Sequence, residues 1–243
     1  MLKLENISWQ SPGGREVLKG LCAAIPAGRL IAITGPNGSG KTTLARIIAG
    51  IERPVSGRIL LEGKDITALD VTGRAREGIS YAFQQPVRFK GLTVRQLLEI
   101  ASGNKLKEDS LCDILSKVGL CANAYINREI NATLSGGEIK RIEIASVLAR
   151  HTRLSVFDEP EAGIDLWSFA NLIQVFENLR KNLQGTLIII SHQERILRIA
   201  DEIMMLDGGK ITASGPPGEM LGKVLETDSA IRACHKQEAM FDA

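Results

Sequence analysis

A glycine-rich segment, "GPNGSGKTT" at residues 35–43, matches the pattern G-x-x-x-x-G-K-[ST] in full. A triphosphate needs many hydrogen-bond donors at close range, and glycines let the backbone fold tightly enough to point its N–H groups inward. The positive end of the following helix, the Lys41 ammonium and a Thr42 hydroxyl for Mg²⁺ complete such a site. The predicted phosphate-binding residues are Gly35, Pro36, Asn37, Gly38, Ser39, Gly40, Lys41, Thr42 and Thr43.

Two carboxylates end the apolar segment "LSVFDE", a costly arrangement unless they meet a cation or water. With a phosphate loop upstream, their roles separate: Asp158 is predicted to hold Mg²⁺, and Glu159 to polarise the attacking water. The segment "LIIISHQ" places His192 at the end of another apolar strand. A lone histidine is more often structural, but if the two strands are neighbours its ring reaches the γ-phosphate.

These residues must be positioned by a sheet with helices around it. The continuous apolar runs "LIAIT", "LSVFD" and "TLIII" indicate buried parallel strands. The segments "KTTLARIIAGI" and "FANLIQVFENLRKNL" have the apolar spacing of helices, and "EIMMLDGGKITASG" predicts a hairpin. Between Gln84 and Leu134 the pattern changes to short amphipathic helices. We therefore predict an α/β core interrupted by a helical lobe.

Composition excludes several classes of protein. The 243 residues carry a net charge of only +2, which argues against nucleic acid as a partner. No apolar run reaches the roughly 18 residues of a membrane span, and "MLKLENISW" does not resemble a signal peptide. We expect a cytoplasmic protein. The four cysteines form no CxxC pair, so we expect no zinc or iron–sulfur site built by this chain alone.

Six motifs occur in one order: GPNGSGKTT, AFQQP, LSGGE, VFDEP, AGID and SHQ. From Leu2 to Gly215 the chain thereby resembles the nucleotide-binding subunit of the ATP-binding cassette (ABC) superfamily. The resemblance implies an ATPase that forms ADP and phosphate. It implies an α/β P-loop NTPase core with an antiparallel β subdomain and an inserted α-helical subdomain. In a single domain, residues 1–83 and 135–215 would form the core, 84–134 the helical subdomain and 216–243 a C-terminal helical tail.

The resemblance also implies roles for individual residues. Glu159 would be the catalytic glutamate, His192 the switch histidine, and Gln84 the Q-loop glutamine that approaches Mg²⁺. Residues 162–165 match the D-loop, which crosses the dimer seam. Ser135 precedes a helix, so its hydroxyl and the following N–H groups form an anion site. The resemblance implies that Ser135, Gly136 and Gly137 complete the ATP site of a second copy, so that two chains enclose two ATP molecules.

The adenine platform and Glu143 leave alternatives open. Many cassette ATPases stack adenine on an aromatic residue after the first strand, but here Ser11 occupies that position. Trp9, two residues earlier on the same strand face, is either the platform or a core residue. Glu143 interrupts an apolar helix pattern, and we expect it to face solvent or to pair with Lys140 or Arg141.

The partner is predicted from a few local features. Glu138, Glu143 and the segment "RAREGISYAFQQPV" resemble SufC-type ATPases, which favours a SufB-like soluble scaffold in iron–sulfur cluster assembly. "DEP" at residues 158–160 is the transporter form, so an ABC membrane permease is the alternative, with the chain peripheral to the membrane. In either case "QPVRFKGLTV" is the predicted docking strip, with Phe89 as an apolar anchor or a core aromatic residue.

Overall fold

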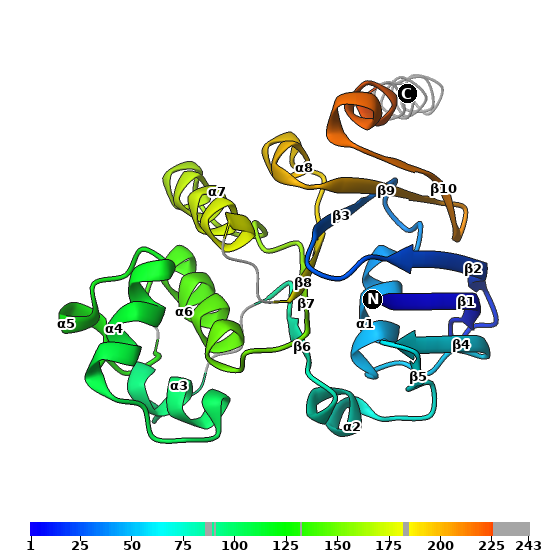
Figure 1. Cartoon of the computed structure of the whole chain (residues 1–243). Helices are drawn as coiled ribbons and strands as arrows, with labels where there is room; N and C mark the ends of the chain where they lie inside the picture. Colours follow the sequence, from blue (N-terminus) through cyan, green and yellow to red (C-terminus); the bar gives the residue numbers. More distant parts are fainter. Residues whose placement is uncertain (86–88, 90, 132, 182–184, 226–243) are drawn as a thin grey trace.

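The computed structural model describes residues 1–85, 89, 91–131, 133–181 and 185–225 (Figure 1). A six-stranded sheet has the order β10-β9-β3-β8-β7-β6, and its strands are parallel except for β10, which pairs antiparallel with β9. Its strands are β3 (Leu30–Thr34), β6 (Ile79–Ala82), β7 (Leu154–Asp158), β8 (Thr186–Ile190), β9 (Glu202–Asp207) and β10 (Lys210–Gly215). The three strands predicted to be buried, β3, β7 and β8, are buried at every residue.

A second sheet of four antiparallel strands has the order β2-β1-β4-β5. Its strands are β1 (Leu2–Gln10), β2 (Glu16–Ile25), β4 (Ser56–Leu61) and β5 (Lys64–Asp65). Helix α1 (Lys41–Ala49) lies between the two sheets, and side chains from all three elements form one hydrophobic cluster (Figure 1). The helix that begins at the phosphate loop is therefore held on two sides.

The remaining helices surround a second cluster on the other face of the six-stranded sheet, except for α2, which lies near α1 (Figure 1). They are α2 (Val71–Arg76), α3 (Val94–Ser102), α4 (Glu108–Lys117), α5 (Ala122–Tyr125), α6 (Gly136–Ala149), α7 (Leu166–Lys181) and α8 (Glu194–Ile199). This arrangement confirms the predicted fold class. The subdomain limits at 84 and 134 stay predictions. Of the predicted tail, residues 217–225 are helical and 226–243 lie outside the described residues.

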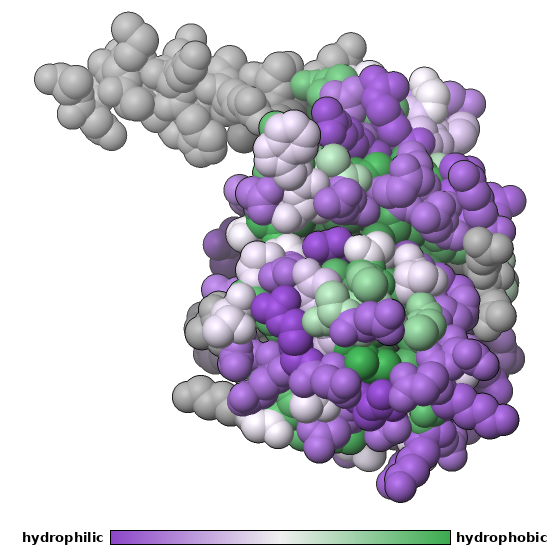
Figure 2. Space-filling model, turned by 90° about the vertical axis from the view of Figure 1, so that its left-hand side faces the viewer, coloured by the Kyte–Doolittle hydropathy of each residue, from purple (hydrophilic) through white to green (hydrophobic). Residues whose placement is uncertain are grey.

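The side of the molecule that carries the helices is mostly hydrophilic, with hydrophobic residues gathered near the middle of that face (Figure 2). Among the described residues, no helix is long and apolar enough to cross a membrane.

A buried arginine holds the far end of α1. The Arg74 side chain is only 1% exposed, and its guanidinium donates hydrogen bonds to the carbonyl oxygens of Ile47 and Ile48 in the last turn of the helix and of Ile66. Burial lowers the pKa of Arg74 to about 10. Because α1 is fixed at this end and packed between two sheets, the phosphate loop at its start has a rigid support.

Candidate nucleotide-binding and hydrolysis site

The phosphate loop joins β3 to α1 and is held close to its neighbours. Gly35 has a φ of +143°, and a Cβ built on it would lie 1.9 Å from the carbonyl oxygen of Leu206 in β9. Gly40 caps α1 with a left-handed φ of +105°. Both positions require glycine, because any larger residue would collide with backbone or adopt a strained conformation. The pattern of glycines seen in the sequence therefore has a steric cause in this fold.

Inside the loop, two polar groups are enclosed. Lys41 is 5% exposed, and its Nζ donates to the carbonyl oxygens of Gly35 and Pro36, each at 2.8 Å. Burial lowers the pKa of Lys41. The Ser39 Oγ is buried and has no hydrogen-bond partner among the described residues. A cradle that encloses an ammonium group and an unpartnered hydroxyl fits an anionic group such as a triphosphate.

Two oxygen-bearing side chains meet beside the loop. Thr42 Oγ1 donates to Asp158 Oδ1 at 3.2 Å, and Asp158 is only 1% exposed. Burial raises the pKa of Asp158. Hydroxyl and carboxylate oxygens are ligands that Mg²⁺ prefers, so the pair fits the predicted metal position.

Tyr81 on β6 belongs to this group, although we did not predict it from the sequence. Its hydroxyl donates to the second oxygen of Asp158 at 2.8 Å, and burial raises the pKa of Tyr81. A tyrosine in a buried strand needs a hydrogen-bond partner for its hydroxyl. That requirement was the available signal, but only the pairing of β6 with β7 identifies the partner.

The three residues predicted to take part in hydrolysis, Gln84, Glu159 and His192, meet where neighbouring strands β6, β7 and β8 end. Gln84 Nε2 donates to Glu159 Oε2 at 2.6 Å, and His192 Nε2 lies 3.8 Å from Glu159 Oε1. Strand β8 pairs with β7, as the role of His192 required. Glu159 has a left-handed φ of +44°, a conformation that costs about 1–3 kcal/mol in a residue other than glycine. Such strain is typical of functional sites.

A third acidic residue, Glu161, supports the strand that precedes His192. Ser191, at the end of β8, donates a hydrogen bond to Glu161 Oε1. Burial raises the pKa of Glu161. Glu161 therefore holds Ser191, the residue next to His192.

Residues 134–138, "LSGGE", which we call the signature segment, lie at the start of α6. Ser135 Oγ accepts from the Glu138 N–H at 3.2 Å, and Glu138 Oε2 accepts from the Ser135 N–H at 2.6 Å, so the two residues form a capping box. A Cβ on Gly137 would lie 2.4 Å from Ser168 Oγ at the start of α7. The helix start is therefore packed tightly against the D-loop side of the molecule.

The signature does not reach the phosphate loop of its own chain. Within the described part of the protein, the hydrogen bonds of Ser135 and Gly137 go to Glu138, Ile139 and Arg141, and none goes to residues 35–43. Helix α6 lies on the opposite face of the six-stranded sheet from α1 (Figure 1). The predicted anion site at Ser135–Gly137 is therefore separate from the predicted phosphate site at residues 35–43.

The position of Glu143 decides between the alternatives that the sequence left open. Glu143 does pair with Lys140, at 2.9 Å between Nζ and Oε2, but it does not face solvent: its side chain is only 14% exposed. Burial raises the pKa of Glu143.

The structure also shows the surroundings of two aromatic residues discussed from the sequence, Trp9 and Phe89. Trp9 is half-buried and packs against the cluster between the two sheets, opposite Leu18 of β2. Its predicted role as an adenine platform stays a prediction. Phe89 is 40% exposed and lines a groove, and the docking-strip residues 86–88 and 90 lie outside the described residues.

The fold and the site together define an ATP-binding cassette ATPase. The family model described as "ABC transporter" matches residues 18–162, and the chain belongs to this family. It is 38% identical, over 90% of each chain, to an uncharacterized ABC transporter ATP-binding protein of Methanocaldococcus jannaschii. A probable ATP-dependent transporter of Synechocystis is 34% identical over 93% of each chain.

A comparison with solved structures also finds proteins of the ATP-binding cassette family. The structure of cbiO1 from Clostridium perfringens, described as part of the ABC transporter complex cbiONQ, aligns with a TM-score of 0.78 at 29% identity and covers 98% of each chain.

Proposed function

We propose that the chain is the ATP-hydrolysing subunit of an ABC membrane transporter, bound peripherally to a permease at the cytoplasmic face. The similar proteins described above carry transporter names, which supports this hypothesis. The comparisons do not support a SufC-like role, so the order of our two hypotheses from the sequence is reversed. The SufC hypothesis rested partly on Glu143. In this chain Glu143 pairs with Lys140 and accepts a hydrogen bond from the Phe83 N–H, and these contacts involve no SufB-like scaffold.

ATP hydrolysis, the chemical part of this proposal, is supported by the convergence of Gln84, Glu159 and His192 beside the phosphate loop and Asp158. In this proposal Glu159 orients and deprotonates the attacking water, and His192 holds the γ-phosphate. Gln84 would approach the Mg²⁺ beside Glu159 and is required for hydrolysis. Lys41 and the loop N–H groups bind the phosphates. Thr42 and Asp158 would hold Mg²⁺, which supplies charge neutralisation when bound.

A second copy of the chain would complete the site. The capped start of α6 presents N–H groups and the Ser135 hydroxyl, yet these make no hydrogen bond to residues 35–43 of the same chain. Because a helix start binds anions well, Ser135–Gly137 would bind the γ-phosphate held by the partner. ATP then joins two chains, and its hydrolysis weakens the joint.

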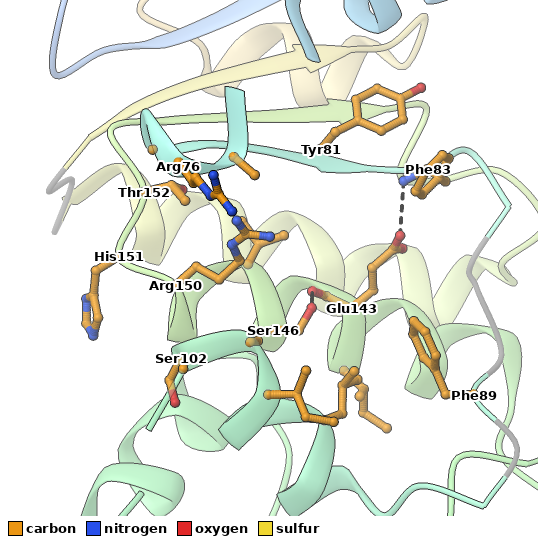
Figure 3. Close-up of a pocket in the computed structure, with 18 of the residues that line it drawn as sticks. Arg76, Tyr81, Phe83, Phe89, Ser102, Glu143, Ser146, Arg150, His151 and Thr152 are labelled. Atoms are coloured by element: carbon orange, nitrogen blue, oxygen red, sulfur yellow. Dashed lines mark hydrogen bonds between the residues drawn. The ribbon is translucent and has the colours of Figure 1, made fainter. Parts of the chain in front are cut away.

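The groove beside the Q-loop is the proposed permease-docking surface. It has a volume of about 660 Å³. Its apolar lining includes Phe83, Phe89 and Ile100, and Arg76 and Arg150 lie at one end (Figure 3). An amphipathic helix with an apolar face and an acidic residue at one end fits this combination of surfaces.

The partner is tested by affinity purification from detergent-solubilised source cells, with tagged wild-type chain, Ile100→Asp and Val55→Asp. Ile100 is 65% exposed in the groove, and Val55 is 66% exposed and does not line it, so neither substitution disturbs the core. A polytopic membrane protein should purify with wild type and Val55→Asp and be lost with Ile100→Asp. A soluble scaffold in its place would contradict the transporter proposal and restore the iron–sulfur hypothesis.

A further inference from the structure

Helix α6 carries a buried ion pair whose function the motifs do not explain. The Lys140 side chain is 1% exposed and that of Glu143 is 14% exposed, and Nζ and Oε2 lie 2.9 Å apart. Removing two charges from water costs several kcal/mol per ion, and their attraction compensates only when further hydrogen bonds satisfy the remaining polar atoms. The other hydrogen bonds of Lys140 and Glu143 therefore identify the segment that this ion pair positions.

Those contacts go to the first residues of the Q-loop. Glu143 Oε1 accepts a hydrogen bond from the Phe83 N–H at 3.0 Å (Figure 3). Lys140 Nζ donates to the carbonyl oxygen of Phe83 and, at 3.4 Å, to that of Gln84. Two side chains, one helical turn apart, thus hold both polar groups of the Phe83 backbone. We call Lys140 and Glu143 the Q-loop clasp.

The Q-loop clasp is one residue away from the hydrolysis site. Gln84 follows Phe83, and its side-chain amide donates to Glu159 Oε2 at 2.6 Å. Upstream, β6 is fixed by its pairing with β7, and Tyr81 packs edge-on against Phe83 with ring centroids 4.9 Å apart. The Q-loop clasp thus connects α6 to Phe83, the residue at which β6 has ended and the Q-loop begins.

We propose that Lys140 and Glu143 are positioning residues for ATP hydrolysis, which fix the backbone from which Gln84 reaches Glu159. The inference rests on the proposed roles of Gln84 and Glu159. Phe83 and Glu143 also line the groove, so the clasp lies between the proposed docking surface and the hydrolysis site. Since α6 begins at the signature, the same helix bears the segment offered to the partner and the side chains that hold the Q-loop.

A kinetic double-mutant cycle tests the proposal. Lys140→Met keeps the length of the side chain and removes its donors, and we expect kcat for ATP to fall about 10- to 100-fold, because misplacing a reacting group by about 1 Å has that effect. In a Gln84→Ala background, where no amide remains to be positioned, the same substitution should change kcat less than about two-fold. The ATP dissociation constant should stay within about two-fold of wild type in every variant.

The outcomes separate this inference from the proposed function. Equal loss of kcat in both backgrounds would show that Lys140 is only structural and overturn the inference, as would no loss in either. A normal kcat for Gln84→Ala alone would instead contradict the proposed role of Gln84. Lys117→Met is the matched control: it breaks an exposed Lys117–Asp113 pair on α4, with 2.6 Å between Nζ and Oδ2, and should leave kcat unchanged.

A second measurement applies even if Lys140→Met does not fold. Glu143→Gln conserves volume and an acceptor for the Phe83 N–H but removes the charge, and Glu143→Leu removes the acceptor as well. Hydrogen exchange of the Phe83 amide should accelerate at least ten-fold in Glu143→Leu and less in Glu143→Gln. An unchanged Phe83 exchange rate in Glu143→Leu would show that the clasp does not hold the loop and would overturn the proposal.

Discussion

Gly137→Ala tests whether the second signature glycine is required by packing within one chain. An added Cβ would lie 2.5 Å from Ser168 Cβ and 2.4 Å from its Oγ. Rotating the Ser168 side chain moves only Oγ, so the starts of α6 and α7 must separate by about 1 Å to reach normal contact. Overpacking of this kind costs about 1–3 kcal/mol. The higher helix propensity of alanine offsets up to about 1 kcal/mol, so we expect a net loss of about 1–2 kcal/mol in unfolding free energy.

The cause is isolated by adding Ser168→Gly. That substitution removes the colliding atoms, and it also removes the hydrogen bond from Ser168 Oγ to Asp165 Oδ2, worth about 1 kcal/mol. In the Ser168→Gly background Gly137→Ala should be neutral or stabilising, which gives a coupling energy of about 2 kcal/mol. Urea unfolding of the nucleotide-free chain, followed by circular dichroism, measures all four variants. Effects that add within about 0.5 kcal/mol would refute the steric argument.

Two further predictions concern the site itself. Ser135→Arg should abolish ATP hydrolysis and leave nucleotide binding by the single chain intact, because Ser135 makes no hydrogen bond to residues 35–43. Loss of nucleotide binding in equilibrium dialysis would contradict this prediction. Tyr81→Phe should raise the Mg²⁺ concentration for half-maximal hydrolysis about ten-fold, because it removes the hydrogen bond that orients Asp158. An unchanged Mg²⁺ dependence would show that the Tyr81 hydroxyl does not orient the metal ligand.

The parts of the site that could be predicted are local in the sequence or follow from strand order. The phosphate loop is nine consecutive residues, so its spacing alone indicates its chemistry. Glu159 and His192 could be placed together because each follows an apolar strand, and the ends of parallel neighbours meet. These arguments need only periodicity and the rules of sheet topology.

The parts that could not be predicted depend on side chains that meet across long sequence separations. Tyr81 reaches Asp158 because β6 pairs with β7, and Glu143 reaches Phe83 because α6 packs beside the end of β6. In the sequence Glu143 could only be assigned to solvent or to a neighbour on its own helix. The comparisons support the alternative partner, a permease, over the favoured SufB-like scaffold. We had used Glu143 as a family marker, whereas its position is explained by a contact within the chain.

In the proposed function, one chain holds ATP and a second copy completes the site. Its most direct test is the mass of Glu159→Gln by light scattering, with saturating ATP and Mg²⁺ and then with ADP. Because the substitution blocks hydrolysis and spares binding, the mass should rise from 26.3 kDa to twice that value with ATP and return with ADP. A protein that stays at 26.3 kDa with ATP bound would contradict the proposal that ATP joins two copies of the chain.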